Sequence, residues 1–151
     1  PEIPETLRLQ YLSKGQEEAF ATLQNHCFRG EWGFSPNTKK QIGTSLQYPG
    51  NYDNGVLLLK DKNHFIGYNW TLLISNTISV EGVISMTGVL PEYRGQGLGK
   101  LVVTLGIDQL QKRGAADTKL TVDADNTPAR ELYLKLGFEK IRQTLWYANS
   151  I

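Results

Sequence analysis

The apolar residues near the start of the chain follow two different periods. Residues 7–12 alternate apolar and polar side chains, which predicts a half-buried strand. After it, Ser13 and Gln16 stand at the spacing of a capping box, so we expect a helix to begin there. Its buried stripe is predicted to be Phe20, Leu23 and Cys27. Ser35 and Pro36 predict the start of a second helix that reaches about residue 46.

The middle of the chain predicts an antiparallel meander. Three runs, residues 56–60, 65–74 and 80–89, are rich in the β-branched and aromatic side chains that favour strands. The polar segments DKNH and SNT separate these runs, and such segments are typical of turns. The segment before the first run, YPGNYDNG at residues 48–55, is predicted to be a loop.

The last third of the chain alternates between helix and strand. A helix that ends near residue 113 is predicted from one apolar face, made of Leu98, Leu101, Val102 and Leu105. Residues 118–124 are predicted to form the next strand, parallel to strand 80–89, because a strand, helix and strand at this spacing require a right-handed crossover. A last helix is predicted from Thr127 to Gly137, with an inner stripe of Ala129, Leu132, Tyr133 and Leu136, and a last strand at residues 145–148.

Composition narrows the class of protein. A chain of 151 residues that is 40% hydrophobic predicts one domain, residues 1–151, with its own core. The 16 basic and 15 acidic residues nearly cancel, which gives no reason to expect a nucleic acid or a membrane as partner. Cys27 is the only cysteine, so an internal disulfide is excluded, a thiolate metal site is disfavoured, and we expect it to be buried. No apolar run has the roughly 18 residues of a membrane span, and the opening PEIPETLRLQ lacks a signal-peptide core, so we expect a cytoplasmic protein.

The stretch RGQGLGK, residues 94–100, places glycines where a predicted strand gives way to a predicted helix. N–H groups at a helix N-terminus are unpaired and carry partial positive charge, so a glycine-rich entry predicts an anion-binding cradle. The dinucleotide fingerprint, counted from Gly95, does not fit because Lys100 replaces its last glycine. The Walker A pattern does not fit because Arg94 and Leu101 stand at two of its fixed positions. The alternative to a cradle is that the glycines only let the helix pack closely on the sheet.

Two motifs in order point to a known family. The stretches VLPEYRGQGLGK and DNTPARELYLKLGF resemble the acetyl-CoA cradle and the following helix of the GNAT superfamily of N-acetyltransferases. In that family V-x-P-x-x-R-G-x-G-x-G joins the fourth strand to the third helix, and N-x-x-A-x-x-x-Y-x-x-x-G-F opens the helix after the fifth strand. The matching residues of this chain are Val89, Pro91, Arg94, Gly95, Gly97 and Gly99, then Asn126, Ala129, Tyr133, Gly137 and Phe138.

The resemblance implies a fold and a reaction. The expected fold is the α/β (α+β) GNAT fold, a mixed, mostly antiparallel sheet of roughly six to seven strands with a central parallel pair and about four helices. The implied function is an N-acetyltransferase that uses acetyl-CoA as co-substrate, with no metal, and moves the acetyl group to a primary amine of a small molecule by direct attack in a ternary complex. The alternatives are a catalytically silent module that binds acyl-CoA and an acetyltransferase of peptide or protein N-termini.

The resemblance gives the cradle residues a role. The groups implied to face the pyrophosphate of coenzyme A are the backbone N–H groups of Gln96, Gly97, Leu98, Gly99 and Lys100. Glycine at 95, 97 and 99 would keep side chains out of the way of the pyrophosphate. Arg94 and Lys100 can add charge-assisted contacts to phosphate, and the alternative for either is a solvated cation.

The end of the strand before the cradle is implied to hold the pantetheine arm. Thr87, Gly88 and Val89 fall where the family's strand carries a bulge and splays from its parallel neighbour. The pantetheine amides would pair there with free backbone groups, as an added strand does. Gly88 suits a bulge because it has no Cβ, and an N–H near Val89 would donate to the thioester oxygen.

Tyr133 is the implied partner of the leaving thiolate. It lies seven residues after Asn126, two helical turns on, where the family often places a hydroxyl beside the sulfur. The ordinary pKa of tyrosine, about 10, exceeds that of a thiol, about 8.5, so we expect a hydrogen bond more than full proton transfer. Asn126 would contact the pantetheine. The alternatives are plain packing for Tyr133 and a capping or turn role for Asn126.

The general base is expected among the carboxylates. Glu81 is the best candidate by position, and the alternative is an exposed glutamate at a strand start. Asp123 and Asp125 are weaker candidates. In the branch that acetylates protein N-termini, a glutamate commonly stands five residues before the motif asparagine, and Thr121 occupies that place here. This departure counts against a peptide acceptor.

The acceptor side of the family lies in the first two helices, their connection and the last strands. That region of this chain holds aromatic residues that can wall a pocket or cover the core, namely Phe28, Trp32, Phe34, Tyr48 and Tyr52. We expect His26 and His64, which have no motif partner, to be structural or solvent-facing. The segment NHCFRGEWGFSP and the lead-in PEIPETLRL resemble the start of the second half of tandem GNAT proteins, of which mycothiol synthase is one. The protein partners left open are a second GNAT domain and a second copy of the chain.

Overall fold

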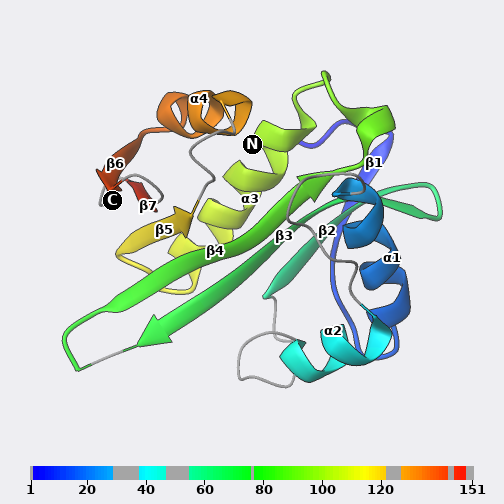
Figure 1. Ribbon diagram of the computed structural model, residues 1–151, viewed down its shortest axis with the longest axis horizontal. Coiled ribbons are helices and arrows are strands. Elements are labelled where there is room, and N and C mark those ends of the chain that lie inside the picture. Colours follow the sequence, from blue (N-terminus) through cyan, green and yellow to red (C-terminus); the bar gives the residue numbers. More distant parts are fainter. Residues whose placement is uncertain are drawn as a thin grey trace.

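The computed structural model describes residues 2–28, 38–46, 55–75, 77–121, 127–142 and 145–148. The elements are, in chain order, β1 (Leu7–Tyr11), α1 (Glu17–Cys27), α2 (Lys39–Leu46), β2 (Val56–Asp61), β3 (His64–Ser75), β4 (Val80–Val89), the short 3₁₀ helix η1 (Pro91–Tyr93), α3 (Leu98–Lys112), β5 (Asp117–Thr121), α4 (Thr127–Lys135), β6 (Phe138–Arg142) and β7 (Leu145–Ala148) (Figure 1). Every helix within these ranges is too short or too polar to cross a bilayer.

One mixed sheet organises the described part of the chain. Its seven strands lie in the order β1-β2-β3-β4-β5-β7-β6. All neighbours are antiparallel except β4 and β5, which pair in parallel from Glu81 opposite Asp117 to Ile84 opposite Leu120. The predicted fold class is therefore confirmed. The strands β2, β3 and β4 form the predicted meander, and α3 connects the two strands of the parallel pair, β4 and β5.

Helices cover both faces of the sheet because β2 is apolar on both faces. Val56 and Leu58 belong to the core cluster of α1, whereas Leu57 and Leu59 belong to the cluster of α3. Successive side chains of a strand point to opposite faces, so α1 and α3 lie on opposite sides. Figure 1 shows α2 near α1 at one end of the molecule and α4 beside α3 at the other.

Some element boundaries differ from the prediction. The helix α1 begins at Glu17, although the Gln16 side chain accepts a hydrogen bond from the Ser13 N–H at 2.9 Å, as one half of a capping box does. The helix α2 begins at Lys39, where Thr38 and Gln41 exchange side-chain to backbone hydrogen bonds at 2.8 and 3.1 Å. The predicted cap at residues 35 and 36 lies outside the described residues.

The strand β6 was not predicted from the residues. Its sequence, FEKIR, follows directly on the last helix and carries three charged side chains, so it lacks the alternation of a half-buried strand. It lies at the edge of the sheet, beside β7 alone, and charged side chains are common on edge strands.

The bulge of β4 lies earlier than predicted. Trp70 pairs with Met86 and Thr71 pairs with Ile84, so the extra residue is Ser85 and the predicted position at residues 87–89 is wrong. Gly88 has a different reason to be glycine. A Cβ added at Gly88 would lie 3.1 Å from the Tyr68 ring and 3.2 Å from the Cβ of Cys27. Cys27 is buried, as predicted.

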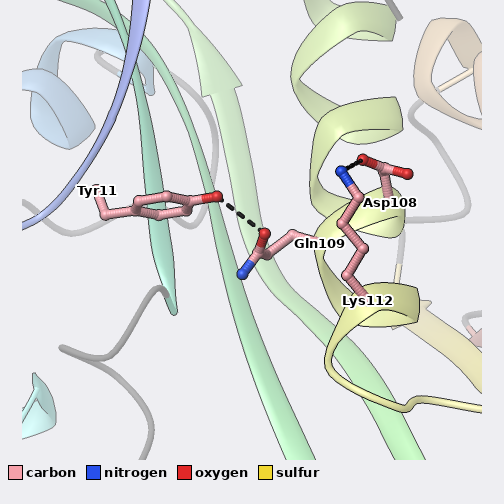
Figure 2. Close-up of polar contacts among 4 residues, drawn as sticks. All are labelled: Tyr11, Asp108, Gln109 and Lys112. Carbon is pink, nitrogen blue, oxygen red and sulfur yellow. Dashed lines mark hydrogen bonds and ion pairs between the residues drawn. The ribbon is translucent and has the colours of Figure 1, made fainter.

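Polar contacts attach α3 to the sheet. Figure 2 shows the Tyr11 hydroxyl reaching across from β1 to donate to Oε1 of Gln109, at 2.9 Å. The ion pair of Asp108 and Lys112 in the same view lies within the helix itself. A second contact comes from β3, where the fully buried Asn69 donates from Nδ2 to the Val102 carbonyl of α3 at 3.1 Å.

Gly106→Ala should destabilise the fold. An added Cβ would lie 2.6 Å from the Asn69 side chain, which is buried and held by its bond to α3. We expect a net loss of about 1–2 kcal/mol in the free energy of unfolding, because overpacking outweighs the better helix propensity of alanine. Gly43→Ala in α2 adds the same methyl group where no atom of the described part of the chain lies within 4 Å, so it should stabilise. Urea unfolding of both variants measures this, and equal effects would contradict it.

Candidate functional site

A cavity of about 550 Å³ lies where the end of β4, the start of α3 and α4 meet. It brings together these residues predicted from the sequence: Thr87, Gly88, Val89, Arg94, Gly95, Gly99 and Tyr133. The remainder of its wall is apolar, from Phe28, Val102, Val103, Ala129 and Leu132. Sequence patterns assigned Val102, Ala129 and Leu132 to core stripes and did not single out Val103. Periodicity could not show that these side chains also face a cavity.

The end of β4 has backbone groups that β3 does not use. The described parallel pairing with β5 runs to Ile84 opposite Leu120, and β4 continues to Val89; residues 122–126 lie outside the described residues, so the predicted splay stays a prediction. The Leu90 N–H donates to the Ile66 carbonyl of β3 at 2.8 Å. Backbone groups of successive residues alternate in direction along an antiparallel pair, so the N–H and C=O groups of Thr87 and Val89 face away from β3. They face the side of β4 on which β5 pairs.

The loop between β4 and α3 has the backbone that the glycines predict. Gly95 and Gly97 have φ angles of +80° and +78°, in the left-handed region that side chains disfavour. Gly97 is the N-cap of α3, and the first bond within the helix runs from the Leu101 N–H to the Gly97 carbonyl at 3.1 Å. The N–H groups of the residues before Leu101 therefore have no acceptor within the helix, and the first turn carries no acidic side chain. This end of α3 is therefore suited to an anion.

Gly99 differs from the other two glycines. Its φ lies outside the left-handed region, and an added Cβ would meet no atom of the described protein within 4 Å. Neither its backbone conformation nor packing within the chain requires glycine, yet Gly99 lines the cavity. The alternative that the glycines serve close packing of helix on sheet fails for all three, because Gly95 and Gly97 have equally open surroundings. The open space fits a ligand that approaches the backbone.

The charged and polar side chains of the loop differ in their bonds to the protein. Arg94 is exposed and lines the cavity, and its guanidinium donates to the carbonyl oxygens of Cys27 and Val89. Gln96 and Lys100 are exposed, and the side chain of Leu98 is buried in the core below α3. The backbone groups of these last three residues remain the predicted contacts.

Tyr133 both packs in the core and lines the cavity. Its side chain is 8% exposed, and its ring lies 5.7 Å from that of Phe138, so it packs in the core. It also lines the cavity. Burial raises the pKa of its hydroxyl above the ordinary value, because the phenolate is poorly solvated there. The hydroxyl therefore stays protonated and can donate a hydrogen bond.

The structure does not bring Glu81 to the cavity. Its carboxylate forms an ion pair with Lys119 on β5, and six residues of strand, about 20 Å, separate it from Thr87. Asn126 and the two weaker candidates for the base, Asp123 and Asp125, lie outside the described residues.

Glu81→Gln should leave turnover within about twofold of wild type. The change removes one partner of a partly exposed ion pair, worth about 0–1 kcal/mol of stability, and no group near the reacting atoms. Initial rates against pH check this. A large loss of rate that shifts the pH profile would restore Glu81 as the base.

The acceptor side is described only in part. Phe28 lines the cavity, whereas Trp32, Phe34, Tyr48 and Tyr52 lie outside the described residues. His26 and His64 line a second cavity, of about 870 Å³, between α1, the β2–β3 turn and η1. Within the described ranges, no three His, Cys, Asp or Glu side chains are grouped so that they could hold a metal ion.

Comparison with known proteins agrees with the motifs. The sequence profile of the acetyltransferase (GNAT) family matches residues 17–138. A mycothiol acetyltransferase from Thermobispora bispora is 32% identical over 149 residues, which cover 93% of this chain and 49% of that protein. The chain spans about half the length of the curated relatives it matches over nearly its full length. This agrees with the resemblance to one half of a tandem protein.

Solved structures share the fold at low sequence identity. The ribosomal-protein-S18-alanine N-acetyltransferase from Escherichia coli has a TM-score of 0.77 at 21% identity, over 94% of this chain and 92% of that one. A chain of the NatC complex bound to Gag peptide and CoA has a TM-score of 0.73 at 18% identity, over 93% of this chain and 94% of that one.

Proposed function

Because the chain belongs to the acetyltransferase (GNAT) family, we propose that it is an acetyl-CoA-dependent N-acetyltransferase domain whose coenzyme lies in the cavity between β4, α3 and α4. One observation carries the proposal. The open space at Gly99 meets, at one cavity, the end of β4 whose Thr87 and Val89 backbone groups face away from β3, which fits a ligand with an anionic end and an arm rich in amides. Pyrophosphate and pantetheine have this chemistry.

The first turn of α3 would hold the pyrophosphate. Its N–H groups have no partner within the helix, and Gly97 directs the chain so that they point outward together. The exposed Lys100 would add charge next to the phosphates. Thr87 on β4 would pair its N–H and C=O with the amides of the pantetheine arm.

The end of β4 and Tyr133 would serve the reaction. Bound acetyl-CoA supplies the thioester, and the amine nitrogen forms its bond to the acetyl carbon as the carbon–sulfur bond breaks. The Val89 N–H, which faces away from β3, would donate to the thioester oxygen as negative charge develops there. The Tyr133 hydroxyl would donate to the departing sulfur, which its raised pKa permits at neutral pH.

The acceptor is proposed to be a primary amine on a small molecule. The relatives matched over most of this chain carry the name mycothiol acetyltransferase, which supports acetyl transfer to an acceptor of that chemistry. Thr121, where the branch that acetylates protein N-termini commonly has glutamate, favours a small molecule over a peptide.

Release of free thiol tests the proposal. Purified protein, acetyl-CoA and a panel of amino sugars, polyamines and peptides with free N-termini are mixed, and free thiol is followed with a chromogenic disulfide. We expect release above background with at least one small amine. Tight binding of acetyl-CoA with no release for any amine would instead support a catalytically silent module, and release with peptides alone would support the N-terminal alternative.

A further inference from the structure

The Arg94 side chain joins the ends of two separate elements. Its Nη2 donates to the Cys27 carbonyl oxygen at 2.6 Å, and its Nε donates to the Val89 carbonyl oxygen at 3.2 Å. Cys27 is the last residue of α1 and Val89 is the last residue of β4. The guanidinium therefore links the helix on one face of the sheet to the strand that borders the cavity.

The bond to Cys27 satisfies the end of α1. The last four carbonyls of a helix have no N–H partner within it, and they form the negative end of the helix dipole. A guanidinium suits this place because it is always charged and its donors lie in one rigid plane. Phe28, the next residue, lines the cavity, so the same bond holds the peptide group that joins Cys27 to Phe28.

The bond to Val89 decides which backbone groups of β4 remain available. The N–H and C=O of Val89 both face away from β3, and the C=O accepts a hydrogen bond from Arg94. The Leu90 N–H, the other polar group of the same peptide, donates to Ile66. The peptide between Val89 and Leu90 is held on both sides, and the Val89 N–H is left directed toward the cavity.

We infer that Arg94 is a positioning residue for acetyl transfer, acting through Val89 and Phe28, and is not a ligand of the coenzyme phosphates. This inference rests on the function proposed above. It replaces the phosphate contact expected from the sequence, since two arms of the guanidinium are bonded to the chain. The loop binds anions through its backbone, and Arg94 fixes the strand end against which the thioester lies.

Two thioesters separate these roles, because acetyl-CoA carries phosphates and S-acetylpantetheine carries none. Arg94→Met keeps the apolar stem and removes the donors, and Lys100→Met is the matched loss of a cation. We expect Arg94→Met to lower kcat by about tenfold with both thioesters while KM for acetyl-CoA changes by less than about threefold. Lys100→Met should raise KM for acetyl-CoA alone.

A different pattern would overturn the inference. An Arg94→Met enzyme that keeps its kcat, shows a raised KM for acetyl-CoA and behaves as wild type with S-acetylpantetheine would identify a phosphate ligand. Arg94→Lys keeps the charge without the planar fork, so we expect kcat to fall with both thioesters; full wild-type kcat would also overturn the inference. If Arg94→Met does not fold, Arg94→Gln, which also removes the charge, carries the same comparison.

Binding alone provides a readout that does not depend on turnover, should no amine release thiol. The affinity for coenzyme A is measured by calorimetry at low and high salt for wild type, the foldable Arg94 variant and Lys100→Met. A phosphate-contacting cation contributes to the salt dependence, because salt screens charge pairs. We expect the Arg94 variant to keep the wild-type salt dependence and Lys100→Met to reduce it. A reduced dependence in the Arg94 variant would contradict the inference.

Discussion

Gly99→Leu should weaken acetyl-CoA binding by about a hundredfold or more, or about 2.7 kcal/mol, without destabilising the fold. Gly99 lies in the first turn of α3, in helical backbone, and none of the described residues has an atom within 4 Å of an added Cβ. A leucine there would project into the space assigned to the pyrophosphate. The helix itself should gain, because leucine has a better helix propensity than glycine by roughly 0.8 kcal/mol. Calorimetric titration and thermal unfolding measure the two effects separately.

Gly43→Leu is the matched control for this change. Gly43 also lies in a helix, α2. Among the described residues no atom lies within 4 Å of an added Cβ there, and Gly43 is not part of the described lining of the coenzyme cavity. It should keep wild-type affinity for acetyl-CoA. Wild-type affinity in Gly99→Leu would show that the coenzyme does not approach this turn of α3. Gly97 is less suitable for such a test, because its φ of +78° would strain any side chain.

Tyr133→Phe should lower kcat by about tenfold or more and leave the affinity for acetyl-CoA near wild type. The ring would still fill its place beside Phe138, and only the hydroxyl proposed to face the sulfur would be lost. Burial disfavours the phenolate and raises the pKa, so the wild-type hydroxyl stays neutral from about pH 7 to about pH 9. The ratio of wild-type to variant kcat should therefore be constant over that range. Steady-state kinetics across pH measure it.

Tyr11→Phe is the control for losing a tyrosine hydroxyl. The Tyr11 hydroxyl bonds Gln109 on the sheet side of α3 and does not line the cavity (Figure 2). We expect about 0.5–1.5 kcal/mol less stability and unchanged kcat. If Tyr133→Phe turns over as fast as Tyr11→Phe, the hydroxyl of Tyr133 serves packing alone.

The sequence predicted the features that depend on local spacing. The order of strands and helices apart from β6, the parallel pair and the left-handed glycines before α3 follow from periodicity and from glycines at fixed intervals. The structure agrees with these predictions because the hydrophobic period of an element and the conformation of its backbone both depend on residues close together in the sequence.

Features that depend on distant neighbours were not predictable in this way. Gly88 was predicted as a bulge residue, but Cys27 and Tyr68, from two other elements, crowd the place of its Cβ. Arg94 was predicted as a phosphate ligand, and the sequence could not show that the end of α1 supplies it with a carbonyl partner 67 positions away. Glu81 was predicted as the base by position, but it lies six residues before Thr87 on β4 and pairs with Lys119 of β5. Only the packed fold shows which partner a polar side chain takes.

Amide chemical shifts during a titration with acetyl-CoA test the location of the coenzyme most directly. Two cavities compete, the one of about 550 Å³ at β4, α3 and α4 and the larger one of about 870 Å³ along α1. We predict that the largest shifts fall on the amides of Thr87, Val89, Gly97, Gly99 and Lys100. Shifts centred on Thr22, His26 and His64, with the amides of the α3 turn unchanged, would contradict the proposed site.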